Sequence, residues 1–105
     1  HYELQFLPLF YDDLEEIVDY ISLKLKNPDA ADKLVDDVFA AIDERVPVAE
    51  SFEPHKSVLK FRYTCYKIYV RNFIIFYVVK DDIPGSKIME VRRILYNRRN
   101  IEKII

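Results

Sequence analysis

FIIFYVV, at residues 73–79, is the longest unbroken apolar run in this 105-residue chain. β-Branched and aromatic side chains of this kind favour an extended strand. Because apolar residues occupy both alternating positions, both faces of the strand must be covered, and we expect the strand at 73–80 to form the centre of a sheet. The run is far shorter than the roughly 20 residues that a membrane helix needs, so the sequence predicts no membrane segment.

Three further strands are predicted around this one. Residues 62–70 and 87–96 are rich in β-branched and aromatic side chains. They connect to the central strand through a tight turn at 71–72, which is Arg-Asn, and a loop at 81–86. Residues 2–8 alternate loosely between apolar and polar and end at a proline, which predicts a short first strand.

Two amphipathic helices are predicted between the first strand and Pro47. Asp12 can cap the first helix while Glu15 reaches back to it. Asn27 and Pro28 end this helix and begin the second, because asparagine is a good helix cap and proline is tolerated in the first turn. The apolar side chains recur every three or four positions, at Phe10, Leu14, Ile17, Val18, Ile21 and Leu25, and then at Ala31, Leu34, Val35, Val38 and Ile42.

These elements predict an α+β fold with the order β-α-α-β-β-β. The N-terminal strand and an antiparallel helical hairpin pack against one face of a mainly antiparallel four-stranded sheet. Residues 1–105 are expected to form a single domain, since this length supports one core. The hairpin covers one face only, so the other face is expected to be a partly apolar concavity for a ligand or a partner.

The two halves of the chain differ in charge. Residues 1–55 carry 14 acidic and 4 basic residues, whereas residues 56–105 carry 12 basic and 4 acidic residues. The formal net charge of −2 therefore averages an acidic surface, mostly on the helices, and a basic one. A basic half that is rich in aromatic residues can meet a polyanion. We expect its cations to gather in one cleft, with the helix carboxylates turned away from it.

Composition excludes several types of site. Cys65 is the only cysteine, so neither an intrachain disulfide nor a thiolate metal site can form, and an inert buried thiol is expected. Gly85 is the only glycine, which argues against a glycine-rich phosphate loop. No metal or other cofactor is predicted. The single cysteine and the lack of a visible secretory signal predict a cytoplasmic protein.

Three parts of the chain carry a family resemblance. They are LEEIVDYI at 14–21 followed by NPDAA at 27–31, KIYVRNFIIFY at 67–77, and VRRILYNRRN at 91–100. In this order they resemble the RelE/ParE superfamily of toxins from bacterial type II toxin–antitoxin modules. The resemblance implies the β-α-α-β-β-β fold and a cognate antitoxin that neutralises the toxin. It also implies one of two activities, which are mRNA cleavage, usually in the ribosomal A site, and poisoning of DNA gyrase.

The last segment departs from the family pattern at two positions. Tyr96 stands where histidine is common, and Asn100 stands where aspartate is common. A free tyrosine has a pKa near 10, so nearby cations must lower the pKa before Tyr96 can exchange protons readily. Some ribosome-dependent members use a C-terminal tyrosine in this way.

Metal-free RNA cleavage needs a base, an acid and cations on the phosphate. Tyr96 and Glu53 are the candidates for proton transfer, and Glu50 and His55 are weaker ones. Simple alternation along the last strand would place Tyr96 on the same face as Arg92, and Arg93 opposite unless a bulge intervenes. The candidate phosphate and RNA contacts are Arg71, Arg93, Arg98 and Arg99, with Lys60, Arg62, Lys67 and Arg92.

Tyrosines 63, 66 and 69 suit either base stacking or cross-strand packing, and the second use is the commoner one. Three functions stay open at this point. The first, which is the leading prediction, is a metal-independent, ribosome-dependent mRNA endoribonuclease that arrests translation, and the cations and Tyr96 favour it. The second is a gyrase poison without chemistry of its own, which the two long helices and the missing histidine favour. The third is an inactive toxin kept for antitoxin binding and operator regulation.

Overall fold

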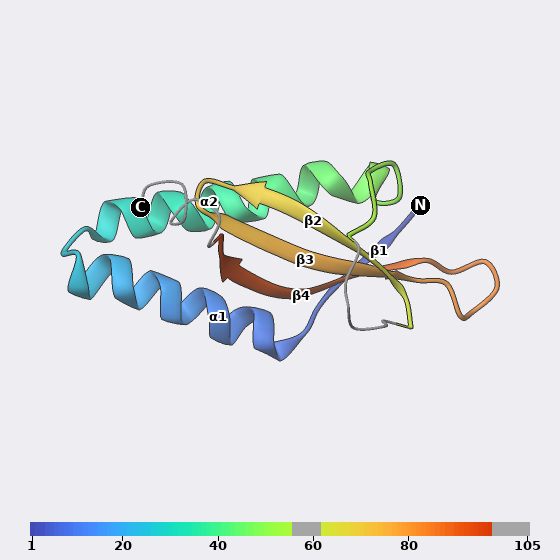
Figure 1. Ribbon diagram of the computed structural model, residues 1–105, viewed down its shortest axis with the longest axis horizontal. Coiled ribbons are helices and arrows are strands. Elements are labelled where there is room, and N and C mark those ends of the chain that lie inside the picture. The colour runs from blue at the N-terminus through green and yellow to red at the C-terminus, as the bar shows by residue number, and fades with distance from the viewer. Residues whose placement is uncertain (56–61, 98–105) are drawn as a thin grey trace.

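The computed structural model describes residues 1–55 and 62–97. The elements follow the predicted order (Figure 1), and the central strand has the predicted bounds. They are β1 (Glu3–Phe6), α1 (Pro8–Asp19), the π-helical turn η1 (Tyr20–Lys24), α2 (Pro28–Arg45), the 3₁₀ turn η2 (Val46–Val48), β2 (Thr64–Val70), β3 (Phe73–Lys80) and β4 (Ile88–Tyr96).

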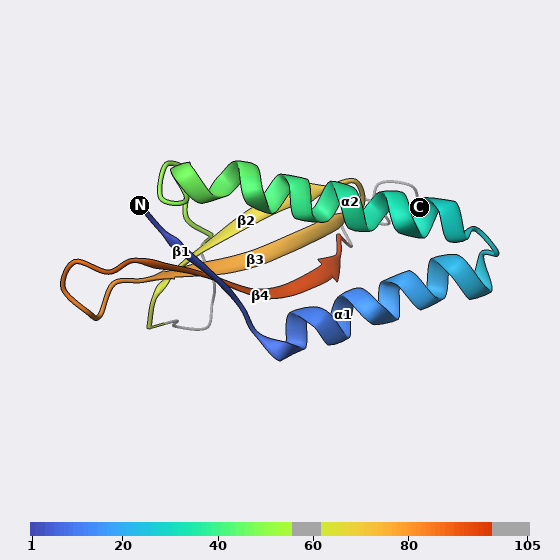
Figure 2. The same ribbon diagram turned by 180° about the vertical axis from the view of Figure 1, so that it is seen from behind.

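The four strands form one sheet in the order β1-β4-β3-β2. β1 runs parallel to β4, and the other two pairs are antiparallel. Both helices lie on one face of the sheet (Figure 2). This arrangement confirms the predicted α+β fold. Within residues 1–55 and 62–97, no helix is both long and apolar enough to span a bilayer.

The start of α1 differs from the prediction. The helix begins at Pro8, with Leu7 as its N-cap residue. Proline is favoured at the first helical position because its missing N–H needs no partner there. The Leu7 N–H donates to the Val91 carbonyl at 2.9 Å, so the chain passes from β1 into the helix without a loop. The predicted cap at Asp12 and Glu15 is therefore wrong, and both residues lie inside the helix.

The hairpin tip extends beyond the end of the sheet (Figure 1). Its π-helical turn closes with the Leu25 N–H donating to the Tyr20 carbonyl at 3.0 Å. Asn27 then caps α2 as predicted, because its Oδ1 accepts from the Ala30 N–H at 3.2 Å. The helix ends at Arg45, before Pro47, also as predicted.

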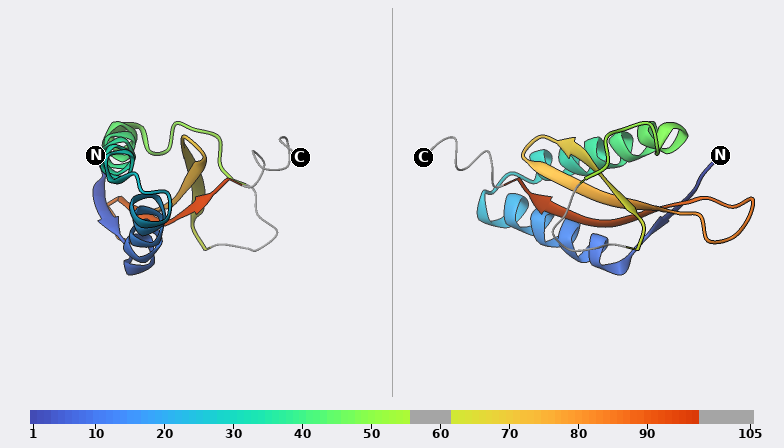
Figure 3. Two further views of the ribbon diagram at one scale, coloured as in Figure 1. Left: turned by 90° about the vertical axis from the view of Figure 1, so that its left-hand side faces the viewer. Right: turned by 45° about the vertical axis from the view of Figure 1, so that its right-hand side comes forward.

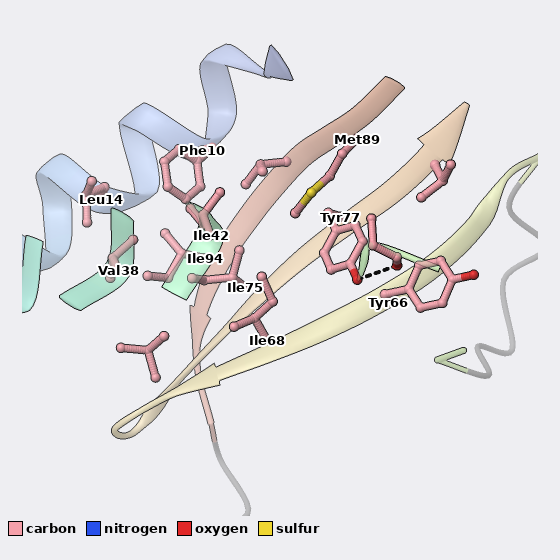
Figure 4. Close-up of a cluster of buried hydrophobic side chains, with 14 of the residues drawn as sticks. Phe10, Leu14, Val38, Ile42, Tyr66, Ile68, Ile75, Tyr77, Met89 and Ile94 are labelled. Carbon is pink, nitrogen blue, oxygen red and sulfur yellow. Dashed lines mark hydrogen bonds between the residues drawn. The ribbon is translucent and has the colours of Figure 1, made fainter. Parts of the chain in front are cut away.

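The core lies between the helical hairpin and the sheet (Figure 4). Tyr77 and Ile75 of β3 are fully buried on this face. On the other face of β3, Ile74 and Val78 are only 9% and 1% exposed. Both faces of β3 are therefore covered, as its unbroken apolar run predicted. The other large buried side chains include Phe10, Leu34, Val38, Ile42, Met89, Val91 and Ile94.

Tyr77 is a polar anchor in this core. Its hydroxyl donates to the Ala49 carbonyl at 2.7 Å, the dashed line in Figure 4, and accepts from Arg45 Nη1 at 3.0 Å. Burial raises the pKa of Tyr77, so the hydroxyl keeps the proton that it donates. These bonds fix the segment after α2 to the sheet. The chain then crosses to the far side of the sheet (Figure 3), where the His55 N–H donates to the Cys65 carbonyl at 2.7 Å.

Replacing Asn27 with alanine is expected to lower the free energy of unfolding by about 1 kcal/mol, because the Ala30 N–H loses its cap acceptor. Urea denaturation measures this change. Lys33→Ala, on the exposed surface of the same helix, is the control and should stay within about 0.5 kcal/mol of the unmodified chain. Equal losses for the two variants would show that the cap contributes nothing.

Candidate functional site

Each arginine between residues 62 and 97 forms an ion pair with a carboxylate. The predicted single cleft of cations, remote from the helix carboxylates, is therefore wrong for the described residues. Lys60, Arg98 and Arg99 lie outside the described residues. The pairs are Arg62–Asp82, Arg71–Asp37, Arg92–Glu90 and Arg93–Asp13, and the lysine pairs Lys80–Glu90 and Lys87–Glu50 add to them.

Arg93 forms a two-pronged pair with Asp13 of α1. Its Nε and Nη2 donate to Oδ2 and Oδ1 at 2.7 and 2.9 Å, and the Ile94 N–H also donates to Oδ2, at 3.1 Å. β1 pairs with β4 only as far as Val91, so Asp13 supplies the acceptor that a longer β1 would have supplied to Ile94. The hydrogen bonds that Arg93 donates to Asp13 raise the pKa of Arg93. Arg93 thus has a structural partner within its own chain.

A β-bulge in β4 separates Arg92 from the regular alternation of the strand. Phe76 of β3 pairs with Arg93, but the next residue, Tyr77, pairs with Val91. Arg92 is therefore the extra residue on β4. Such a bulge changes which way the following side chains point.

Tyr96 consequently lies on the helix side of the sheet. In a regular strand, side chains on one face are separated by an even number of residues. Val91 and Ile94 are both in the core although they are three residues apart. The Tyr96 ring packs edge-on against the Phe73 ring, with 5.6 Å between centroids. Arg92 instead forms its ion pair with Glu90, at 3.3 Å. The alternation that placed Arg92 beside Tyr96 is therefore wrong.

Tyr96 is part of a hollow beneath the hairpin tip, which we call the hairpin groove. Its volume is about 720 Å³, and most of its lining is apolar. Tyr96 is 47% exposed there, and Arg71 shares the groove but pairs with Asp37. The lining residues are Asp13, Glu16, Ile17, Tyr20, Ile21, Leu25, Leu34, Arg71, Asn72, Phe73, Ile94, Leu95 and Tyr96.

A second hollow brings other predicted residues together at the outer strand β2. We call it the β2-edge pocket, and its volume is about 580 Å³. It contains Glu53 and Lys67, so it unites one predicted proton-transfer residue with one predicted RNA contact. Tyr96 and the paired arginines do not line it. The lining residues are Arg45, Phe52, Glu53, Pro54, His55, Lys67 and Tyr69.

Arg45 and Phe52 line this pocket although neither was singled out from the sequence. The Arg45 Nη1 donates to the Lys67 carbonyl and to the Tyr77 hydroxyl, both at 3.0 Å. Its guanidinium carbon lies 3.5 Å from the centroid of the Phe52 ring. A cation in the last turn of a helix is already favoured by the helix dipole, so its sequence position gave no signal of a further role.

The three tyrosines of the β2 region have different roles. Tyr66 is buried, and its ring stacks on Tyr77 with 5.2 Å between centroids and 17° between planes, which is the predicted cross-strand packing. The Tyr63 hydroxyl donates to Asp82 at 2.6 Å. Tyr69 is 56% exposed and lines the β2-edge pocket. Only Tyr69 among them offers an exposed ring beside a cation within that pocket.

Glu50, one of the weaker candidates, and Cys65, the expected inert thiol, each have a structural explanation. Glu50 accepts from Lys87 at 2.6 Å and from the Tyr2 hydroxyl at 2.8 Å, and the bond from Lys87 is the main reason why the pKa of Glu50 is lowered. Cys65 is 6% exposed, and burial raises the pKa of its thiol, as expected for an inert cysteine. In the part of the chain that the structure describes, no cluster of side chains is suited to hold a metal ion.

Comparison with known proteins agrees with this fold. A family model for the ParE toxin of the type II toxin–antitoxin system, parDE, matches residues 4–101. The chain belongs to the ParE toxin family. It is also similar to a solved structure titled as the chromosomal ParDE toxin–antitoxin system from P. aeruginosa, with 21% sequence identity and a TM-score of 0.69 over 90% of this chain and 95% of that one. No curated protein matches the chain.

Membership of the ParE family confirms the predicted RelE/ParE resemblance and has one direct consequence. A ParE toxin belongs to a toxin–antitoxin system, so an antitoxin protein is its partner. The hairpin groove and the β2-edge pocket are two recesses in the part of this ParE chain that the structure describes.

Replacing Asp13 with alanine is expected to lower the free energy of unfolding by about 2 kcal/mol, because Arg93 and the Ile94 N–H lose their acceptor at a partly buried site. Asp12→Ala is a matched control, since this neighbouring carboxylate is exposed and should change stability by less than about 0.5 kcal/mol. Chemical denaturation of both variants measures the difference. If both variants lose the same free energy, Asp13 does not fasten α1 to β4.

Proposed function

We propose that this ParE toxin poisons DNA gyrase by binding it, without chemistry of its own. The carrying observation is that the arginines at 62, 71, 92 and 93 all pair with carboxylates of the same chain. A phosphate-cleaving site needs positive charge aimed at the phosphate in the transition state. Charges that are already neutralised by neighbouring carboxylates serve this purpose poorly, whereas a binding surface does not need them. The function then places the protein in the cytoplasm, with its target.

The position of Tyr96 supports the same proposal. A tyrosine that transfers protons needs nearby cations to lower its pKa. Among the residues that the structure describes, Tyr96 packs on Phe73 in a mostly apolar groove, and Arg71, the cation that lines this groove, pairs with Asp37. This environment suits a contact residue at a protein interface, where a tyrosine can present an apolar ring and a polar hydroxyl.

Ribonuclease activity is the second candidate, and one observation favours it. Glu53 and Lys67 line the same pocket, so a carboxylate for proton transfer and a cation for a phosphate lie together. A nuclease on this chain would therefore use the β2-edge pocket, without Tyr96.

The hairpin groove is the surface that best suits the antitoxin. Exposed apolar side chains line it, including Tyr20, Leu25 and Leu95, which are 55%, 56% and 39% exposed. An amphipathic segment rich in aliphatic and acidic residues can place its apolar side there while its carboxylates face the basic half of the chain.

Two parallel assays distinguish the two activities. One contains gyrase and supercoiled plasmid, and the other is a translating extract that contains mRNA. Addition of the purified toxin is expected to yield linear plasmid in the presence of gyrase and to leave mRNA intact in the extract, as mapped by primer extension. Tyr96→Phe should retain the linearisation, because it removes only the hydroxyl. Codon-phased mRNA cuts that disappear in Glu53→Gln, with no linear plasmid, would contradict the gyrase proposal and support the nuclease.

Leu25→Glu tests the antitoxin surface. A carboxylate in the apolar groove is expected to weaken binding of the cognate antitoxin by at least about tenfold, as measured by calorimetry. Leu23→Glu is the matched control, because Leu23 is 73% exposed on the same turn but does not line the groove. Equal effects of the two substitutions would place the antitoxin elsewhere.

A further inference from the structure

We propose that the β2-edge pocket binds a nucleotide, with the phosphate on Lys67 and the base against Tyr69. This assignment goes beyond the proposed gyrase function and does not depend on it. A volume of about 580 Å³ falls within the usual range for small-molecule sites. The proposal follows from three kinds of side chain that this pocket combines: cations without carboxylate partners, exposed aromatic rings and one carboxylate.

Lys67 supplies the charge for the phosphate. Of the strand cations that the structure describes, Lys80, Arg92 and Arg93 each pair with a carboxylate, whereas Lys67 does not. Its Nζ lies 6.0 Å from the centroid of the Phe76 ring. A lysine ammonium is a compact point charge that suits a phosphate.

Arg45 adds a second, fixed positive charge. Within residues 1–55 and 62–97 it forms no ion pair, and its two hydrogen bonds to neutral oxygens both use Nη1. Those bonds and the contact with Phe52 hold the guanidinium at the pocket wall. A cation that is positioned before the ligand arrives loses little conformational entropy on binding.

Exposed aromatic rings supply the surface for a base. Tyr69 is 56% exposed and Phe52 is 46% exposed, although Arg45 already covers one face of Phe52. Tyr69 and Lys67 are two residues apart on β2, so their side chains point to the same face of the sheet. Base stacking on an aromatic ring beside a cation is the common mode of binding for single-stranded nucleic acids.

Glu53 makes the pocket selective for a nucleotide over a simple anion. Its carboxylate repels free phosphate but can accept hydrogen bonds from a sugar hydroxyl or a base amino group. The pocket therefore offers an interaction to the phosphate, the sugar and the base of a nucleotide. Inorganic phosphate is attracted only by the two cations and is repelled by the Glu53 carboxylate.

Fluorescence anisotropy of short labelled oligothymidine (DNA) and oligouridine (RNA), with AMP and inorganic phosphate as competitors, tests this site on the full chain. We expect Lys67→Gln and Tyr69→Ala each to weaken binding about tenfold. Lys33→Gln and Tyr11→Ala are the matched controls and should bind as the unmodified chain does. Lys33 lies about 18 Å from Arg45 along α2, and Tyr11 is 50% exposed on α1 and lines neither hollow.

The outcomes separate the sources of the ligand. A nucleotide site is supported if AMP displaces the labelled oligonucleotide at concentrations at which inorganic phosphate has no effect. The oligonucleotide that binds more tightly shows whether the site prefers RNA or DNA. Glu53→Gln should reduce the preference for AMP over phosphate. The proposal is overturned if no oligonucleotide or AMP binds, if phosphate competes as well as AMP does, or if the Lys67 and Tyr69 variants match their controls.

Discussion

The pairing of helix carboxylates with sheet cations is the constraint on which the surface of this protein depends. Asp13 and Asp37 of the helical hairpin engage Arg93 of β4 and Arg71 of the β2–β3 turn. Exposed ion pairs contribute little to stability. The Asp13 pair differs, because this partly buried carboxylate also accepts the Ile94 N–H where β1 ends. The same contact thus satisfies the free N–H at the sheet edge and gives Arg93 a carboxylate partner within its own chain.

Because these ion pairs occupy the arginines of the described sheet, the surfaces left for binding a ligand or partner that we consider are the hairpin groove and the β2-edge pocket. The hairpin groove is mostly apolar, whereas the β2-edge pocket contains Lys67 and Arg45, which form no ion pair among the described residues, beside the exposed ring of Tyr69. Our proposals place the antitoxin on the first surface and a nucleotide on the second. Gyrase poisoning requires such binding surfaces, and it requires no catalytic group.

Much of the fold could be predicted because each element carries a local signal. The apolar run of β3, the helical period of α2 and the Asn27 cap all specify structure over a few residues. The start of α1 was missed, since Asp12 and Glu15 form a good capping pattern that Pro8 overrides by starting the helix directly after β1. For the candidate site, Glu53 and Lys67 were singled out from the sequence and line one pocket, their roles remaining predictions, whereas Arg45 was not singled out.

By itself, the sequence determined the order of the elements, the central position of β3 and the family, because hydrophobic period, caps and local motifs are properties of neighbouring residues. Only the tertiary structure decided which charges remain available. The partner of Arg93 lies 80 residues away in Asp13, and a bulge at Arg92 turns Tyr96 toward the helices. Ion pairing and strand register depend on contacts between distant segments, and those contacts exist only once the helical layer has packed on the sheet.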